Sequence, residues 1–224
     1  MKHTINALCA VFLILAGLTS CGALPPRVTK EIEMADPCTV LVFESRAIAR
    51  GKLPTNNLGK ACVSLPASYA SSPDRRYPVV YALNGFGDGA LAMLCAIRDA
   101  SVTPPQDASE FILVAIDGGT SFYANSPASG YWEDMVTREA VSLIDSRYRT
   151  IAGPEGRVLA GFSMGGFGAW NIALAHPDIY SAAWSCCPGA WDENGLRDTP
   201  RGWDSVYRNA YGAAYAPDLS LPPP

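Results

Sequence analysis

A serine between two glycines is the part of this chain whose residue types and spacing most directly suggest chemistry. Residues 161–165 read Gly-Phe-Ser-Met-Gly, after an apolar segment and before a helix-like one. A nucleophilic serine sits on such a sharp strand-to-helix turn, and glycines two positions before and after it leave room for the turn. The pattern therefore predicts Ser163 as a nucleophile, shaped by Gly161 and Gly165. The competing interpretation is a glycine-rich turn without chemistry.

A second glycine-rich segment, residues 84–90, follows another apolar strand candidate. Acyl transfer needs two backbone N–H donors for the oxyanion, one after the nucleophile and one from a loop of this kind. Met164 and Phe86 are the predicted donors. The spacing of Gly85, Gly87 and Ala90 also fits a dinucleotide fingerprint, but two strand candidates precede it and Asp117 lies too far along to bind a ribose.

A general base for Ser163 is not found in the sequence. The chain holds two histidines, His3 and His176. His176 is predicted on the helix that Ser163 opens, which would carry it about 20 Å away, whereas a base must lie within hydrogen-bonding reach of its nucleophile. We interpret His176 as a helix C-terminal residue, and His3 as part of an export segment.

The N-terminus resembles a bacterial lipoprotein signal. Lys2 precedes an uncharged run, 7–18, too short for a membrane span, and Leu18-Thr19-Ser20-Cys21-Gly22 resembles a lipobox. We expect a signal peptide over 1–20, lipidation of Cys21, a tether over 21–37 and a domain over 38–224. The protein would be exported and anchored to a bacterial membrane, on its periplasmic side or at the cell surface. An ordinary secretory signal is the alternative.

Composition limits the remaining function classes. The chain has 224 residues, 49% of them hydrophobic, which suits one domain, and its net charge of −4 without a basic block argues against nucleic acid. Five cysteines remain beyond residue 21, so at least one thiol has no partner within the chain; Cys38 and Cys62 could form a bridge. No metal or organic cofactor is predicted. The five are Cys38, Cys62, Cys95, Cys186 and Cys187.

Short apolar strands alternating with helices predict an α/β fold. The sheet is expected to be mainly parallel, with helices on both faces and an antiparallel entry by its first two strands. The strand candidates are 39–44, 61–65, 78–83, 111–116, 157–160 and 180–186. The helix candidates are 88–100, 132–147 and 164–176. In 132–147 the apolar residues repeat at helical spacing and predict one buried face.

Four segments in order resemble the esterase D-like family of α/β-hydrolases. They are Leu65 to Tyr69, Arg76 to Gly85, Asp145 to Thr150 and Gly161 to Gly166, and the resemblance covers roughly 61–189. The family includes S-formylglutathione hydrolases, feruloyl and acetyl-xylan esterases, enterochelin esterase-like proteins and mycolyltransferases.

The resemblance implies Ser163 as nucleophile and Phe86 and Met164 as the oxyanion hole. It also implies that the aromatic loop 117–132, with Tyr123 and Trp132, borders the substrate; the alternative is that these rings only cover the sheet edge. Asn84 stands where the family often has histidine. The strands that carry the family's acid and histidine are not found, so we expect a C-terminally incomplete domain with an exposed last strand. Asp192, Asp198, Asp204 and Asp218 are assigned to no triad.

These observations favour a serine hydrolase lineage that acts on carboxylic esters, such as carbohydrate, feruloyl or siderophore-type esters. Its activity is expected to be impaired without a base. Two alternatives remain open. One is a non-catalytic surface lipoprotein that binds a glycan or another ligand, and the other is an acyltransferase, because the acyl-enzyme is common to hydrolysis and transfer.

Overall fold

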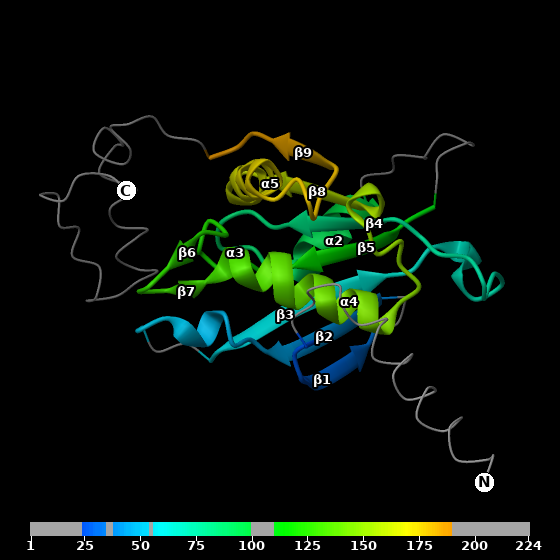
Figure 1. Ribbon diagram of the computed structural model, residues 1–224, viewed down its shortest axis with the longest axis horizontal. Helices are drawn as coiled ribbons and strands as arrows, with labels where there is room; N and C mark the ends of the chain where they lie inside the picture. Colours follow the sequence, from blue (N-terminus) through cyan, green and yellow to red (C-terminus); the bar gives the residue numbers. More distant parts are fainter. Residues whose placement is uncertain (1–23, 35–37, 54–55, 100–109, 190–224) are drawn as a thin grey trace, which may run out of the picture.

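A seven-stranded sheet, in the order β1-β2-β3-β5-β4-β8-β9, forms the centre of the molecule (Figure 1). The computed structural model describes residues 24–34, 38–53, 56–99 and 110–189. Its strands are β1 (Val28–Glu33), β2 (Cys38–Glu44), β3 (Leu58–Ser64), β4 (Val79–Leu83), β5 (Ile112–Ile116), β8 (Arg157–Phe162) and β9 (Ala182–Cys186), with a small separate pair, β6 (Asn125–Ser126) and β7 (Gly130–Tyr131).

The helices connect these strands and cover the sheet. They are α2 (Ala90–Asp99), α3 (Trp132–Asp134), a π-helix η3 (Met135–Ala140), α4 (Val141–Arg147) and α5 (Met164–Ala175), with short 3-10 turns at Ile48–Arg50, Ala67–Tyr69 and Pro154–Gly156. Among the described helices, none is long and apolar enough to cross a bilayer.

The sheet has an antiparallel half and a parallel half. β1, β2, β3 and β5 pair antiparallel, whereas β5, β4, β8 and β9 pair parallel. The carboxyl ends of β4 and β8 therefore meet at one edge of the sheet, with Leu83 opposite Gly161. Loops that follow neighbouring parallel strands lie together at such an edge. The predicted α/β fold is confirmed, and it brings the two glycine-rich segments side by side.

Helices cover both faces because the central strands are apolar on both sides. Every residue of β5 is buried. One face packs with α4, η3 and α5 into the larger core, and the other packs with α2 around Leu94. In Figure 1, α4 lies in front of the sheet and α2 behind it. The predicted strands and helices are confirmed to within a few residues at their ends.

The predicted tether over 21–37 is wrong for Val28–Glu33, which forms the edge strand β1 and pairs with β2. The sequence pattern of this strand was weak because β1 carries Lys30, Glu31 and Glu33 and most of its residues stay exposed. Charged residues are common on edge strands, where they oppose pairing with other chains. The sheet therefore begins before the expected boundary at residue 38. Residues 1–23, with the expected signal peptide and Cys21, lie outside the described residues.

The helix predicted over 132–147 is present, with the expected buried face, but its middle is a π-helix. The wide turn carries Glu139, whose carboxylate is buried. This carboxylate accepts hydrogen bonds from Ser45 Oγ at 2.5 Å and from the backbone N–H groups of Arg46 and Ala47 at 2.9 and 3.0 Å. The π-helix thus holds the turn that follows β2.

The proposed bridge between Cys38 and Cys62 is not formed. Cys38 lies opposite Ser64 and Cys62 lies opposite Val40, so the two cysteines are diagonal neighbours across β2 and β3. Facing partners come closer than diagonal ones in an antiparallel pair. Cys62 is a buried free thiol.

Candidate active site

Ser163 occupies a sharp turn between β8 and α5. Its backbone has φ 54° and ψ −116°, a conformation that side-chain-bearing residues rarely adopt. A Cβ atom on Gly161 would lie 2.0 Å from the carbonyl oxygen of Gly165, and one on Gly165 would lie 1.9 Å from that of Leu83. Both positions require glycine because the turn presses against its own backbone and against the end of β4. This is the geometry of a nucleophile elbow.

Backbone hydrogen bonds hold the serine in this strained position. Its N–H donates to the carbonyl of Cys186 at 2.9 Å, and its carbonyl accepts from Phe167 at 3.0 Å and from Gly189 at 3.1 Å. The side chain is half-buried, at the N-terminus of a twelve-residue helix. The positive end of the helix dipole favours negative charge at this point, as an oxyanion would bring.

The loop after β4 lies against the elbow. The Cβ position of Gly85 is 3.6 Å from the ring of Phe162 and 3.8 Å from its carbonyl oxygen. Phe86 and Met164, the two predicted oxyanion donors, thus belong to segments in contact, one on this loop and one in the first turn of α5.

Asn84, which the sequence analysis left without a role, holds that loop in place. The side chain is fully buried, and its Nδ2 donates to the carbonyls of Gly85 at 2.8 Å and Asp88 at 2.9 Å. Its Oδ1 accepts from the N–H of Gly118 at 3.0 Å and lies 2.8 Å from Tyr123 Oη. One amide therefore joins the loop after β4 to the loop after β5.

Tyr123 was expected to border the substrate, and the structure contradicts this. Only 1% of it is exposed, and its Oη lies 2.8 Å from the N–H of Asn84 and 3.0 Å from the carbonyl of Ile116. Burial holds the pKa of Tyr123 well above its usual value, since a phenolate there would lose its water. Its ring packs against Gly118 and Gly168, where added Cβ atoms would lie 2.3 and 2.7 Å away. Tyr123 therefore supports the loop after β4 and the helix α5 from within the core.

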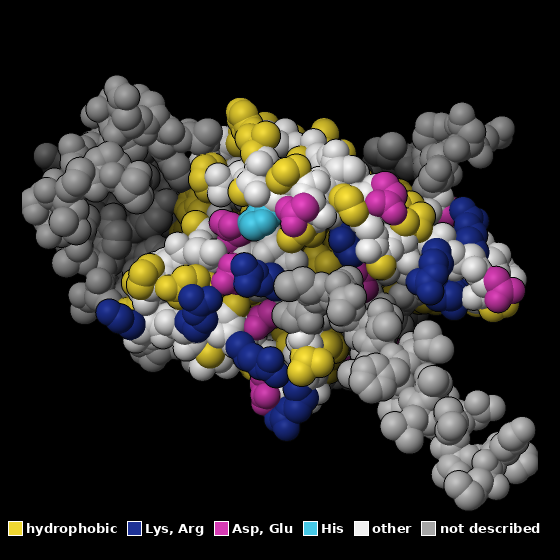
Figure 2. Space-filling model, in the orientation of Figure 1, with side chains coloured by type: hydrophobic (Ala, Val, Ile, Leu, Met, Phe, Trp, Pro, Cys, Tyr) yellow, Lys and Arg dark blue, Asp and Glu magenta, His cyan; other side chains and the backbone are white. Residues whose placement is uncertain are grey.

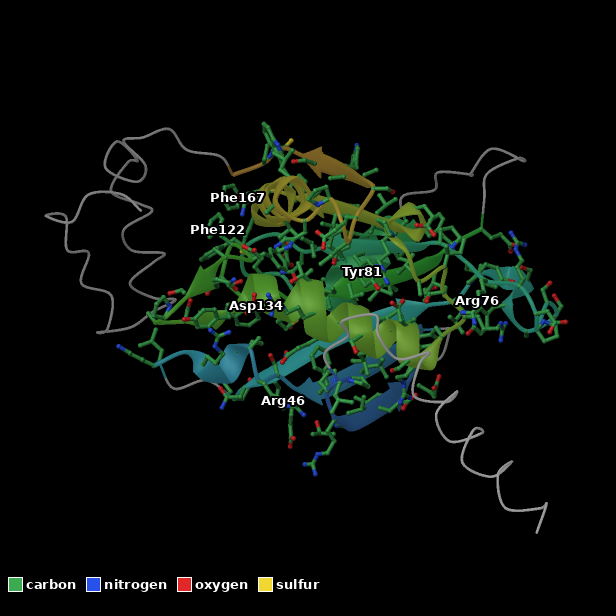
Figure 3. All side chains as sticks on the ribbon, viewed as in Figure 1. Arg46, Arg76, Tyr81, Phe122, Asp134 and Phe167 are labelled. Atoms are coloured by element: carbon green, nitrogen blue, oxygen red, sulfur yellow. The ribbon has the colours of Figure 1, made fainter. Side chains whose placement is uncertain are left out.

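Phe122, the residue before Tyr123, has its ring beside the first turn of α5. Both residues have positive φ, 55° and 57°, which turns the loop so that the two rings separate. The Phe122 ring lies between Phe86, at 5.8 Å between centroids, and Phe167, at 6.1 Å. Figure 3 shows Phe122 and Phe167 close together beside α5. Three aromatic rings thus gather beside the elbow, from the loop after β4, the loop after β5 and the first turns of α5.

Trp132 is half-buried and holds its own hairpin. Its Nε1 donates to the carbonyl of Ser129 at 2.9 Å, and its ring lies 3.7 Å from the Cβ position of Gly119. A contact between Trp132 and substrate remains a prediction.

His176 lies at the C-terminal end of α5, as predicted, with its Nε2 2.8 Å from a carboxylate oxygen of Glu133. Figure 2 shows this histidine on the surface beside acidic side chains. Another carboxylate, Asp145, is paired with Arg157 at 2.6 Å and Thr150 at 2.7 Å. Within the described part of the chain, no side chain forms a hydrogen bond with Ser163 Oγ and no group of three His, Cys, Asp or Glu could hold a metal. The four aspartates of 190–224 lie outside that part.

Comparison with curated proteins places the chain among esterases. An esterase of Mycobacterium tuberculosis is 34% identical over 129 residues, which cover 54% of this chain and 27% of that protein. An endo-1,4-beta-xylanase/feruloyl esterase of Xylanibacter ruminicola is 28% identical over 147 residues, covering 58% and 19%. The matched segment therefore spans about a quarter or less of the length of these relatives.

Solved structures share the fold. A ferulic acid esterase superposes with a TM-score of 0.54 at 24% identity, covering 71% of this chain and 65% of that one. An S-formylglutathione hydrolase from Agrobacterium tumefaciens gives 0.53 at 17% identity, covering 83% and 68%. The family model described as "Putative esterase" matches residues 55–212, well over half of the chain. The chain therefore belongs to this esterase family and has its α/β-hydrolase fold.

Proposed function

We propose that this protein is a serine hydrolase of carboxylic esters and that Ser163 is its nucleophile. The observation that carries the proposal is the strained backbone of Ser163, at the junction of β8 and α5 and against the loop that holds Phe86. Oγ would attack the ester carbonyl carbon, and the oxyanion would face the N–H groups of Phe86 and Met164. The C–O bond to the alcohol would then break as the Oγ proton passes through water to the leaving oxygen. Water would then release the acid from the acyl-enzyme.

Hydrolysis of p-nitrophenyl acetate by the wild-type chain and by Ser163→Ala tests this proposal. We expect Ser163→Ala to lower the rate at least about tenfold, because it removes the acyl-enzyme route. A fluorophosphonate probe should label Ser163 and no residue in the variant. Ser185→Ala is the matched control, since this serine also lies beside α5, donating to Gly166 at 2.8 Å. Undiminished hydrolysis by Ser163→Ala would refute the assignment.

For the acyl group, we propose an aromatic acid. Support comes from the three rings of Phe86, Phe122 and Phe167 around the elbow, because stacked or edge-on rings hold an aromatic ligand better than an acetyl group. Two of the similar proteins are named as feruloyl or ferulic acid esterases. Phe122→Ala should raise KM for methyl ferulate about tenfold and leave p-nitrophenyl acetate nearly unchanged. Equal effects on both substrates would remove the support for an aryl ester.

A second candidate function is ligand binding without catalysis. It is favoured by the position of His176, the one histidine of the described residues, at the far end of α5 and paired with Glu133. Under this alternative, methyl ferulate or a feruloylated sugar binds equally well to wild type and to Ser163→Ala, and no product forms. Formation of a new ester with an added sugar would indicate acyl transfer instead.

We also propose that the protein is exported and carries lipid at Cys21, which anchors it to a bacterial membrane. The support is the sequence alone, with its short apolar run and the Leu18 to Gly22 pattern. Expression with an alkyne-bearing fatty acid should label the wild-type chain in a bacterial host, and Cys21→Ala should remove the label and release the protein from the membrane fraction. A labelled Cys21→Ala variant would contradict lipidation at this residue.

A further inference from the structure

Two adjacent cysteines lie beside the elbow: Cys186 is the last residue of β9, and Cys187 follows it. Their sulfur atoms lie 3.9 Å apart, with Cys186 S–H donating to Cys187 Sγ. Cys187 is exposed and Cys186 is half-buried, whereas Cys62 is buried in the core and Cys95 stands exposed on α2. The pair is therefore two thiols in contact with each other and open to solvent.

The backbone of this pair is strained, and it forms a hydrogen bond with Ser163. Cys187 has φ 45°, an unfavourable conformation for a residue with a side chain. The carbonyl of Cys186 accepts the N–H of Ser163 at 2.9 Å and would lie 2.7 Å from a Cβ atom on Gly166. The peptide group that joins the two cysteines thus also positions the elbow.

We propose that Cys186 and Cys187 form a reversible disulfide with each other, by exchange with a low-molecular-weight disulfide such as oxidised glutathione. The thiolate of Cys187 attacks one sulfur of the small disulfide, which expels one thiol and leaves a mixed disulfide on Cys187. The thiolate of Cys186 then attacks Cys187 Sγ and expels the second thiol. The protein gives up two protons and two electrons, and the small disulfide is reduced to two thiols.

The order of these steps follows from the hydrogen bond between the thiols. Donation to Cys187 Sγ raises the pKa of Cys186, because loss of its proton would break the bond. Cys187 is also the more exposed of the two residues. Attack therefore begins at Cys187, and Cys186 resolves the mixed disulfide.

Closing the disulfide changes the site beside it. A disulfide between neighbouring residues forms a small ring that includes their shared peptide group, so we expect the orientation of the Cys186 carbonyl to change. That carbonyl is the acceptor for Ser163 N–H. Displacement of a reacting group by about 1 Å can cost about 100-fold in rate. This consequence, unlike the disulfide itself, rests on the proposed role of Ser163.

Peptide mass spectrometry of the full chain tests the disulfide directly. Trypsin releases residues 158–197, which contain Cys186 and Cys187 and no other cysteine, and residues 77–98, which contain Cys95 alone. After treatment with oxidised glutathione, we expect peptide 158–197 to lose two hydrogens and to regain them with dithiothreitol. Peptide 77–98 is the internal control and should carry a glutathione instead.

One single variant completes the test. Cys186→Ser should trap glutathione on Cys187, because the resolving thiol is absent. If peptide 158–197 of the wild type carries two glutathiones, or stays reduced while Cys95 reacts, the proposal is wrong. With the disulfide formed, labelling of Ser163 by a fluorophosphonate should slow about tenfold or more. Unchanged labelling would disprove the coupling to the nucleophile, and absence of labelling in the reduced protein as well would count against the proposed function rather than the disulfide.

Discussion

Gly165 fits between the elbow and the end of β4 with no space for a side chain, since its Cβ atom would lie 1.9 Å from the carbonyl of Leu83. Gly165→Ala should lower the free energy of unfolding by about 3 kcal/mol, because the backbone of Leu83 and Asn84 must move to make room. Gly89→Ala is the matched control, since nothing lies within 4 Å of its Cβ position and its φ is ordinary. Urea denaturation measures both, and equal stability of the two variants would contradict this account.

We expect Asn84 to position Phe86 rather than to contact substrate. Asn84→Ala should therefore lower kcat for p-nitrophenyl acetate about tenfold and leave KM nearly unchanged, because it removes two hydrogen bonds to the oxyanion loop and two to the loop after β5. Asn171→Ala, exposed on α5, serves as the control. An increase in KM with unchanged kcat would mean that Asn84 acts on substrate binding instead.

At the level of single residues, the sequence predicted the residues whose role depends on their distance along the chain from Ser163. Gly161 and Gly165 follow from the sterics of the turn. The burial of Tyr123 could not be predicted, because its hydroxyl bonds to Asn84, 39 positions away in the chain. Asn84 was undervalued for the same reason, since its partner Gly118 lies 34 positions away in the chain.

Among the elements, the π-helix η3 offers the clearest test of how contacts between distant parts of the chain stabilise the fold. Glu139→Ala should destabilise the protein by about 3 kcal/mol, because Ser45 Oγ and two backbone N–H groups lose a buried acceptor. Glu139→Gln keeps an acceptor oxygen and should cost about 1 kcal/mol. Thermal unfolding of the two variants checks the difference. A neutral Glu139→Ala would show that water replaces the carboxylate.

Most strands and helices were predictable because their apolar residues repeat at the period of the element. β5 is apolar throughout and was predicted within one residue. β1 was missed because an edge strand with one exposed face has little of this pattern. The π-helix was missed as well, since the apolar face of 132–147 suits either kind of helix and the buried contact of Glu139 is visible only in three dimensions.

For the whole molecule, alkaline pH should weaken the fold. Burial raises the pKa of Cys62 from 9.0 to about 12, so the folded state keeps a proton that the unfolded chain loses above pH 9.0. The contribution of Cys62 to the free energy of unfolding is therefore fully present below pH 9.0 and is lost as the pH rises toward 12. Melting temperatures of wild type and Cys62→Ala, measured below pH 9.0 and again between pH 9.0 and 10.0, check this before most of the contribution of the buried tyrosines Tyr81, Tyr123 and Tyr180 is lost, since their unfolded value is 10.0. An equal decline in both proteins would exclude Cys62 as the cause.

The pairing of β3 with β5 has a consequence for how the chain folds. Residues 61–64 of β3 pair with residues 113–116 of β5, and this is the only ladder through which the antiparallel half joins the parallel half among the described strands. β1 to β3 can pair with near neighbours in the chain, while the parallel strands need long crossovers and fold more slowly. Hydrogen exchange during refolding should protect β2 before β8. The turn between β8 and α5, which holds Ser163 in its strained conformation, would thus form last, against a sheet whose antiparallel half is already folded.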